Sequence, residues 1–477
     1  MKYEFFLSKE DDRSYSLLKF LEESPNLSET LLKIQEELSL STFLLKKTID
    51  KLNDDIEAFG ISQHLKLIVN GPELILEIDG KYSSGFLLSK YIQQSIYLDL
   101  LIEFFRETYT TLEAFANDHH ISYSSAYNML QELKKMLKKH QIYFDKKKLY
   151  GNQRNIILFY YQLFLMADVT YTRVYPEEVI TLVNKLIALL QSEYSLSICE
   201  YKKIFHYLAI HLLADKSKIL MLNPAITSFF PQQEVSKIAH LCYSTTYKLS
   251  EEFMYHILIW LYLNGKLEEM KYVDNSDNTI KSLNERFIKD FEEHFKPLET
   301  QVTLRVSQEL NKIHFNLLYY PMNRFNEFDM NIYFFRQTYP EYYFYLLEYI
   351  NKLTTEYEQL SQSKTFLFFS YLMLLINCIP IQFISEPLKV IIDFSYGTAY
   401  NQFIKKNLGF YINLNVEVIE NEHPECTDVV ITNMNNLYKD NNAEIVVWLD
   451  PPRPVDWGNL TKILLRVQSE RYKQHDC

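Results

Sequence analysis

The 477-residue chain carries 49 Lys and Arg against 61 Asp and Glu, a formal net charge of −12. Its length exceeds what one hydrophobic core serves, so several domains are expected, and its net charge taken alone argues against DNA binding. Only 9 Gly and 14 Pro, with abundant Leu, Ile, Lys, Glu and Tyr, favour a multidomain, mainly α protein.

Further composition features limit the functional classes. Five scattered cysteines without a CxxC pair are typical of reduced thiols in a cytoplasmic protein. The N-terminus lacks a signal-peptide layout. The most apolar run, 366–383, contains Ser370, Asn377 and Pro380 and predicts a buried core helix, so no membrane contact is expected. No cofactor motif occurs, and His119-His120 lacks the partners of a metal site, so we expect neither cofactor nor metal, and no enzyme.

The charge is unevenly distributed. Residues 1–80 hold 9 basic against 16 acidic side chains, a local −7, whereas residues 81–155 hold 11 against 7, a local +4. Because local charge governs contact with phosphate more than the sum does, the second stretch is the better candidate for nucleic acid.

Residues 14–79 predict a helix-turn-helix followed by a hairpin around Asn70-Gly71, a strong turn signal. Its second helix is expected to expose four residues suited to DNA contact: Thr42, Phe43, Lys46 and Lys47. Neighbouring acidic residues would repel phosphate. This unit is therefore expected to be the weaker DNA binder, serving shape recognition, dimer contacts or an extended site.

Residues 112–151 predict a winged helix-turn-helix, in which a second helix enters the major groove of DNA. Ser122 is placed to cap that helix. Apolar residues recur at helical spacing and are expected to face inward, namely Ala126, Met129, Leu130, Leu133 and Leu137. The alternative for this stretch alone is an ordinary amphipathic helical hairpin with a solvated charged face.

The outward positions of the same stretch suit DNA. Base-edge contact is expected from Tyr123, Ser124, Ser125, Asn128 and Gln131, with Tyr127 beside them. Phosphate contact is expected from Lys134, Lys135, Lys138 and Lys139, and in the hairpin from Lys146, Lys147 and Lys148. Asn and Gln pair with adenine and few arginines are available for guanine, so A/T-rich or bendable DNA is predicted.

The two stretches are related by an offset of 81 residues, which places Ser41 on Ser122. Seven apolar positions then coincide without a gap from 34 to 61, the last placing Ile61 on Ile142. This agreement indicates a duplicated helix-turn-helix rather than two unrelated hairpins.

The remaining chain divides into helical and mixed parts. Helical periodicity continues from 155 to about 385, with a polar linker at 271–279, and predicts two bundles. After Pro387, apolar strands alternate with helices and predict a small α/β domain with a parallel sheet buried on both faces. The predicted domains are 1–80, 81–154, 155–273, 274–385 and 386–477.

This order of parts resembles the Mga/AtxA family of virulence-linked regulators from Gram-positive bacteria. The resemblance is carried by AFANDHHISYSSAYNMLQELKKML and the following LYGNQRNIILFYYQLF. It implies two winged helix-turn-helix units, two bundles like the regulatory domains (PRD) of the sugar phosphotransferase system, and a C-terminal domain like that system's IIB component. It further implies a cytoplasmic homodimer joined through 386–477, with the system's phosphocarrier proteins as further partners.

The same resemblance raises the question of phosphate chemistry. The bundle positions that accept phosphate in the family are occupied here by Lys202, Ile259 and Leu375. Nearby candidates are His206, His211, His256 and His314, which need accessible, neutral imidazoles; packing between helices is the competing interpretation. The IIB-like loop 393–398 lacks the cysteine that a phosphocarrier needs, so the domain is expected to keep the fold without the chemistry.

The sequence thus predicts a DNA-binding transcriptional regulator. The alternative is a phosphotransferase-linked phosphoacceptor or protein-binding scaffold that does not bind DNA. A third class, RNA-binding antitermination, would call for a short β-rich N-terminal domain, whereas the first 150 residues are mainly helical.

Overall fold

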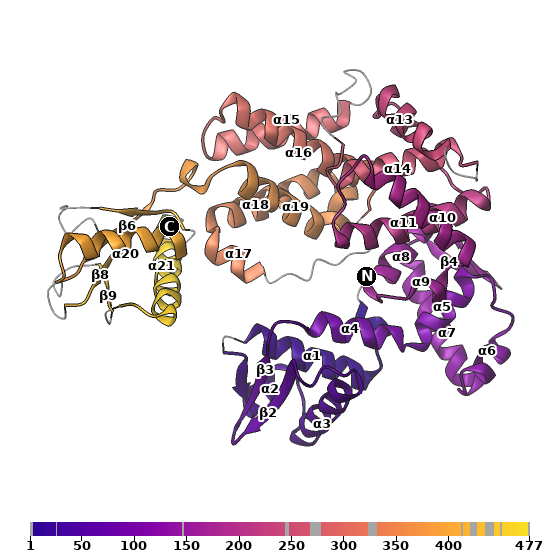
Figure 1. The fold of residues 1–477 in the computed structure, drawn as a ribbon, viewed down its shortest axis with the longest axis horizontal. Coiled ribbons are helices and arrows are strands. Elements are labelled where there is room, and N and C mark those ends of the chain that lie inside the picture. The colour runs from indigo at the N-terminus through magenta and orange to yellow at the C-terminus, as the bar shows by residue number, and fades with distance from the viewer. Residues whose placement is uncertain are drawn as a thin grey trace. The chain divides into compact units, whose positions relative to one another are not determined.

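A computed structural model describes residues 3–24, 26–145, 147–243, 248–267, 278–322, 332–411, 414–419, 427–434, 443–448 and 451–475. The chain is mainly α-helical, with a small parallel sheet near its C-terminus (Figure 1). It divides into two compact units, residues 1–274 with 322–327, and residues 275–321 with 328–477. The linker predicted at 271–279 lies almost wholly outside the described residues.

The first winged unit follows a short 3₁₀ turn, η1 (Tyr3–Phe6). Its helices are α1 (Lys9–Glu23), α2 (Leu31–Glu37) and α3 (Thr42–Ala58), and its strands are β1 (Ser28–Thr30), β2 (Leu65–Asn70) and β3 (Glu73–Ile78). The strands form one antiparallel sheet in the order β1-β3-β2. Asn70 pairs with Glu73, and Gly71 takes a φ of 59° in the turn, as the Asn-Gly signal predicts.

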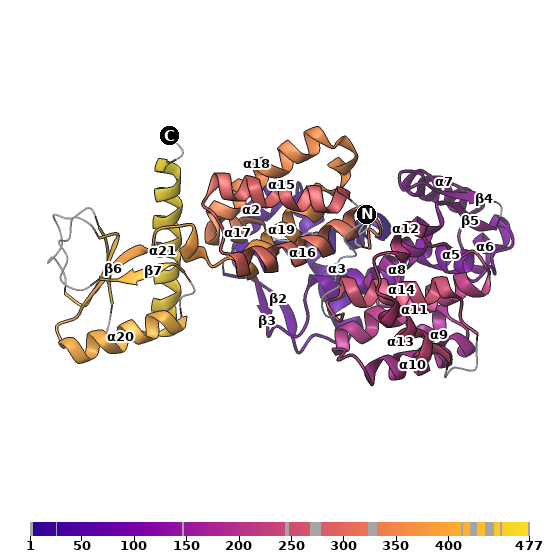
Figure 2. The same cartoon turned by 90° about the horizontal axis from the view of Figure 1, so that it is seen from above.

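The second winged unit follows two connecting helices. These are α4 (Ser84–Gln93) and α5 (Ile96–Phe105); the unit itself comprises α6 (Leu112–Asp118), α7 (Tyr123–Lys138), β4 (Ile142–Asp145) and β5 (Lys148–Gly151). Figure 2 shows α6, α7 and the hairpin grouped together. At the base of the hairpin, Gly151 has a φ of +126°, and a Cβ there would lie 2.4 Å from the Gln141 carbonyl oxygen, so only glycine fits.

The first helical block continues directly from the second hairpin. It comprises α8 (Gln153–Met166), α9 (Tyr171–Val174), α10 (Glu177–Gln191), α11 (Ile198–Lys216), α12 (Pro224–Thr227), α13 (Gln232–Tyr243) and α14 (Glu251–Leu263). Helix α11 packs against α8, α10 and α14 and is buried over most of its length. Its middle part, from Ile204 to Leu212, is buried on every side, as expected of a helix at the centre of a bundle.

The second helical block belongs to the other unit. It comprises α15 (Asn278–His294), α16 (Thr300–Leu318), α17 (Ile332–Thr338), α18 (Pro340–Glu356), η2 (Glu358–Ser363), α19 (Lys364–Cys378) and η3 (Ile381–Phe383). Its core is rich in tyrosine and phenylalanine, with Phe287, Tyr349 and Tyr371 in mutual ring contact. The apolar run predicted to be a buried core helix is α19, confirmed by the burial of Leu367, Leu372 and Leu375.

The C-terminal part is a four-stranded parallel sheet in the order β7-β6-β8-β9. Its strands are β6 (Leu388–Asp393), β7 (Val416–Val418), β8 (Val429–Thr432) and β9 (Glu444–Val447), and its helices are α20 (Thr398–Tyr411) and α21 (Pro454–His475). The prediction of a parallel sheet is confirmed. The prediction that both faces of the sheet are buried is wrong at β9, where Ile445 and Val447 are exposed and Val446 between them is buried. Residues of α20 and α21 belong to the same core as Val446, so the other face of β9 is left uncovered.

Candidate nucleic-acid interface

The turn between α6 and α7 fixes the direction of the second helix. His120 adopts a left-handed φ of 54°, which reverses the chain after α6. The Ser125 amide then donates to Ser122 Oγ at 3.1 Å and closes the first turn of α7, as the sequence predicts. The geometry is that of a helix-turn-helix with its second helix, α7, presented to solvent along one side.

The inner side of α7 holds the unit together. Ala126, Leu130, Leu133 and Leu137 are buried, as are Phe115 and Ala116 of α6. Met129, the fifth residue predicted to face inward, is only half-buried. The apolar periodicity therefore determines which side of α7 is free for a ligand.

The outer side of α7 presents the predicted base-contacting side chains. Six such residues are exposed, namely Tyr123, Ser124, Ser125, Tyr127, Asn128 and Gln131. Ser122 Oγ also lies 2.8 Å from Ser125 Oγ and 3.0 Å from Ser124 Oγ, so the first turn carries three linked hydroxyls. The amides of Asn128 and Gln131 project one turn further along, where both donors and acceptors are available to base edges.

The lysines of this unit differ in their surroundings. Lys135, Lys138, Lys139, Lys147 and Lys148 are exposed, and no ion pair within the described part of the chain involves them. Lys134 is half-buried, with Nζ 5.1 Å from the Phe144 ring centroid, so its charge is directed toward the wing. Lys146 lies outside the described residues. The exposed lysines thus carry positive charge that no ion pair neutralises within the described ranges.

In the first unit, carboxylates neutralise part of the positive charge of the equivalent helix, α3. Thr42, Phe43, Lys46 and Lys47 are exposed on α3, as predicted. However, Lys47 Nζ lies 2.5 Å from Glu10 Oε1, and Lys51 Nζ lies 2.8 Å from Asp11 Oδ1 and 2.6 Å from Asp55 Oδ2. Helix α1 thus supplies carboxylates to lysines of α3, which lowers the attraction of this surface for phosphate.

Sequence reasoning missed two aromatic side chains on the second wing. Tyr143 and Tyr150 face each other across β4 and β5 and are 39% and 48% exposed. The alternation of Ile142, Phe144 and Leu149 with polar positions could have placed both tyrosines on the outer face of the hairpin.

A charged network ties the helix-turn-helix to the first helical block. Arg173 of α9 lies 2.6 Å from Asp99 of α5, and His119 at the end of α6 lies 3.7 Å from Asp99 and 3.8 Å from Glu103. Burial raises the pKa of Glu103 above its ordinary value, and His119 opposes that shift. This network positions α6 relative to the helices that follow the wing.

The candidate phosphate-accepting histidines are all enclosed. His206, His211, His256 and His314 are at most 3% exposed. Desolvation lowers the pKa of His206 and His314 to about 3 and of His211 to about 4, and it lowers the pKa of His256 well below its ordinary value. These imidazoles are neutral, but none is accessible at a bundle surface, so the second requirement for phosphate transfer is not met.

Their polar contacts are typical of packed histidines. His314 Nδ1 donates to Asn284 Oδ1 at 2.5 Å, and its Nε2 accepts from Tyr371 at 2.7 Å, which joins α15, α16 and α19. In the first block, His206 Nδ1 lies 2.9 Å from the Tyr175 hydroxyl. Such buried hydrogen bonds specify how helices pack.

In the loop 393–398, two backbone amides donate hydrogen bonds to asparagine side chains. The Phe394 amide donates to Asn401 Oδ1 and the Ser395 amide to Asn433 Oδ1, each at 3.0 Å. A phosphate in this loop would have to displace those side-chain carbonyls. Residues 393–398 contain no cysteine to carry phosphate. The expectation of a IIB-like fold without phosphocarrier chemistry stays a prediction.

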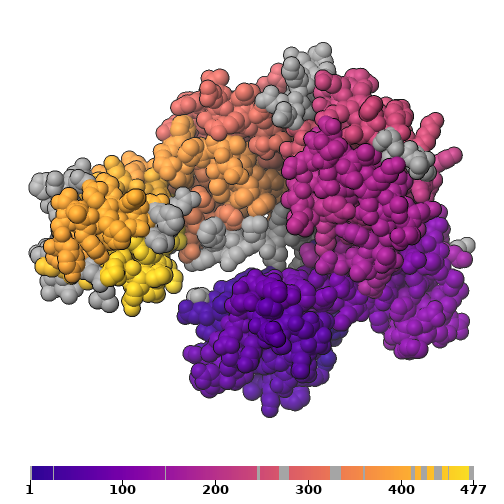
Figure 3. All heavy atoms as spheres, viewed as in Figure 1, coloured from indigo at the N-terminus to yellow at the C-terminus, as the bar shows by residue number. Residues whose placement is uncertain are grey.

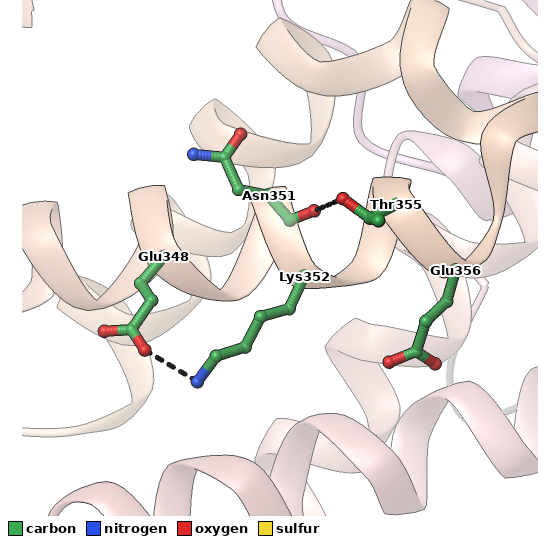
Figure 4. A pocket seen from close by; sticks show the side chains of 5 residues that line it. All are labelled: Glu348, Asn351, Lys352, Thr355 and Glu356. Atoms are coloured by element: carbon green, nitrogen blue, oxygen red, sulfur yellow. Dashed lines mark hydrogen bonds and ion pairs between the residues drawn. The ribbon is translucent and has the colours of Figure 1, made fainter.

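One polar hollow in the second unit is lined by charged side chains that already pair with one another. It has a volume of about 470 Å³ and is lined by one face of α18, with Glu348, Asn351, Lys352, Thr355 and Glu356 (Figure 4). Lys352 Nζ lies 2.7 Å from Glu348 Oε1, and Glu356 pairs with Arg286. The charges satisfy one another, as on an ordinary solvated helix face.

The described residues also bear on metals and membranes. Within the ranges given above, no group of three His, Cys, Asp or Glu side chains is placed to hold a metal ion. No helix in those ranges is long and apolar enough to cross a bilayer.

The fold and the exposed α7 surface define a winged helix-turn-helix unit, a kind of unit that typically binds DNA. Residues 81–164 match the family described as "Mga helix-turn-helix domain". This part of the chain is therefore similar to the DNA-binding domain of Mga-type transcriptional regulators, and the resemblance seen in the sequence is confirmed for residues 81–164. A search of curated proteins found no match to the chain. The two helical blocks and the C-terminal domain lie outside the matched residues.

Proposed function

We propose that this regulator binds A/T-rich or bendable promoter DNA as a homodimer, with α7 of the second winged unit in the major groove. The observation that carries the proposal is the contrast between the two units. Lys135 and Lys138 are exposed and outside the ion pairs of the described chain, whereas Lys47 of the first unit pairs with Glu10. Phosphate affinity is therefore concentrated on the second unit.

The preference for A/T-rich DNA follows from the chemistry of α7. This helix presents Asn128 and Gln131, which pair with adenine, and carries no arginine for guanine. Exposed lysines on α7 and on the wing would bind the flanking backbone and favour DNA that bends toward them.

The homodimer is proposed to form through residues 386–477. Support comes from β9, which is an edge strand of the C-terminal sheet, as is β7, and exposes Ile445 and Val447. An edge strand with exposed β-branched residues favours pairing with another chain. A two-fold dimer would present two copies of α7 to two half-sites.

We propose that the sugar phosphotransferase system acts on this regulator only after a helical block has opened. The enclosed positions of His206, His211, His256 and His314 mean that phosphorylation requires a helical block to open first. Phosphocarrier proteins are therefore proposed as partners of an opened block, which would shift the assembly equilibrium of the regulator.

A salt titration of DNA binding tests the proposal. The full chain should bind an A/T-rich duplex, and the affinity should fall steeply as salt rises. K135A/K138A should weaken binding and reduce the slope of log K against log[salt] by about 2, one for each lost phosphate contact. K47A is the matched control and should leave the slope unchanged. Absence of DNA binding by the purified chain at low salt would refute the proposal and favour the scaffold alternative.

A further inference from the structure

The outer face of the second wing is centred on a pair of tyrosines. Tyr143 and Tyr150 are register partners in β4 and β5, and their ring centroids are 5.5 Å apart with 35° between the ring planes. Both side chains remain substantially exposed, at 39% and 48%. The two rings therefore form one aromatic surface on the solvent side of the hairpin.

The hairpin does not need these rings for its own packing. Ile142 and Leu149 are buried on the opposite face, and Phe144 lies there with its ring centroid 4.4 Å from that of Phe104. Because side chains alternate between the two faces of a strand, the inner set anchors the wing and the tyrosine pair is left outside. The pair contributes cross-strand contact but no core.

Exposed tyrosines are concentrated in this unit. Among the described residues, six tyrosines are more than a third exposed, and four of them lie between positions 123 and 150. The other two are Tyr243 and Tyr396. Most tyrosines of the chain pack between helices, so this local excess marks a contact surface rather than a general property of the sequence.

We infer that the Tyr143–Tyr150 face is a second DNA contact, binding the sugar–phosphate backbone beside the groove that α7 enters. The inference rests on the proposed function. Phenolic hydroxyls donate to phosphate oxygens, and ring faces pack against deoxyribose. Lys147 and Lys148, exposed at the turn of the same hairpin, add positive charge next to the pair. The ligand is therefore duplex DNA.

The tyrosine contact has a signature that separates it from lysine contacts. A neutral side chain releases no counterions when it meets phosphate, so its share of the affinity does not depend on salt. Loss of the pair should weaken binding by the same factor at low and high salt. Loss of Lys147 and Lys148 should instead reduce the salt slope.

The test uses the full chain and an A/T-rich duplex spanning several helical turns. Y143A/Y150A should bind about ten-fold more weakly, or about 1.4 kcal/mol, with an unchanged slope of log K against log[salt]. Hydroxyl-radical footprinting should lose protection at sugars flanking the α7 contact, while protection of the sugars at the α7 contact itself persists. Y243A, which removes an exposed tyrosine elsewhere, is the control and should bind like the unaltered chain.

A conservative variant identifies the chemistry. If Y143F/Y150F binds like the unaltered chain, ring packing on deoxyribose carries the contact; if it binds as weakly as Y143A/Y150A, the hydroxyls carry it. Both outcomes support the inference. Unchanged affinity and footprint in Y143A/Y150A overturn it, as does a lower molecular mass by light scattering with intact DNA affinity, which would assign the pair to a protein partner. Failure of the unaltered chain to bind overturns the proposed function itself.

Discussion

Ser39 and His120 adopt the same left-handed backbone conformation, with φ of 52° and 54°, at positions 81 residues apart. Each lies in the turn of a helix-turn-helix. The first helices span Leu31–Glu37 and Leu112–Asp118, and the second helices begin at Thr42 and Tyr123, all at the same offset. The shared strained turn supports duplication more directly than apolar spacing does, because two unrelated hairpins have no reason to share it.

Replacing Ser39 or His120 therefore has a predictable effect. S39G and H120G should leave the free energy of unfolding unchanged or raise it slightly, because glycine adopts positive φ without strain. H120V should lower it by about 1 kcal/mol, because a β-branched residue tolerates the left-handed region less well than histidine does. Urea unfolding of the full chain measures both. Equal stability of H120V and H120G would contradict the strained-turn interpretation.

The duplication loses its register after the second helix. Helix α3 ends at Ala58 and β2 begins at Leu65, whereas α7 ends at Lys138 and β4 begins at Ile142. Ile61 therefore lies in the connection between α3 and β2, and the ungapped match that placed it on Ile142, a strand residue, is wrong at that point. Both residues are buried isoleucines, so their shared apolar character made the two positions look equivalent in the sequence.

The lysines of α7 should not contribute equally to DNA binding. Lys135 is exposed, whereas Lys134 lies over the Phe144 ring. K135A should lower the slope of log K against log[salt] by about 1. K134A should change that slope less and should instead destabilise the wing, by about 0.5–1 kcal/mol for a lost cation–π contact. Fluorescence titrations at several salt concentrations distinguish the two. A larger slope change in K134A than in K135A would contradict this placement.

Exposed residues of β9 provide a test of self-association. Ile445 and Val447 are exposed on β9, an edge strand of the C-terminal sheet. I445E/V447E should lower the molecular mass measured by light scattering, because like charges brought together across paired chains repel. Binding to a single half-site should remain. An unaltered mass would show that β9 is not the dimer contact. Figure 3 shows the C-terminal part in orange and yellow.

Some of this structure is predictable from sequence and some is not, for physical reasons. The buried side of α7 follows from periodicity, since Ala126, Leu130 and Leu133 recur at helical spacing. The pairing of Lys47 with Glu10 does not, because it joins residues of two helices that only the fold brings together. Helical spacing likewise marks His314 as a residue of α16 but does not show that Asn284 and Tyr371 enclose it.

The enclosed histidines predict a loss of stability in acid. An unfolded histidine has a pKa near 6.5, whereas burial lowers the pKa of His206 and His314 to about 3 and of His211 to about 4. Between those values the unfolded chain binds protons that the folded chain does not. The free energy of unfolding should therefore fall as pH drops from about 6.5 toward 4, by up to about 1.4 kcal/mol per pH unit for each group.

A variant of one histidine isolates its share of that pH dependence. H314Q removes the titrating group while keeping a neutral donor and acceptor near Asn284 and Tyr371. Its absolute stability should be lower because the new side chain fits less well, so the slope with pH is the informative quantity. Urea unfolding at pH 7, 6 and 5 should show a slope smaller by about one proton than in the unaltered chain. An identical slope would mean that His314 is protonated in the folded block, and therefore that solvent reaches it there.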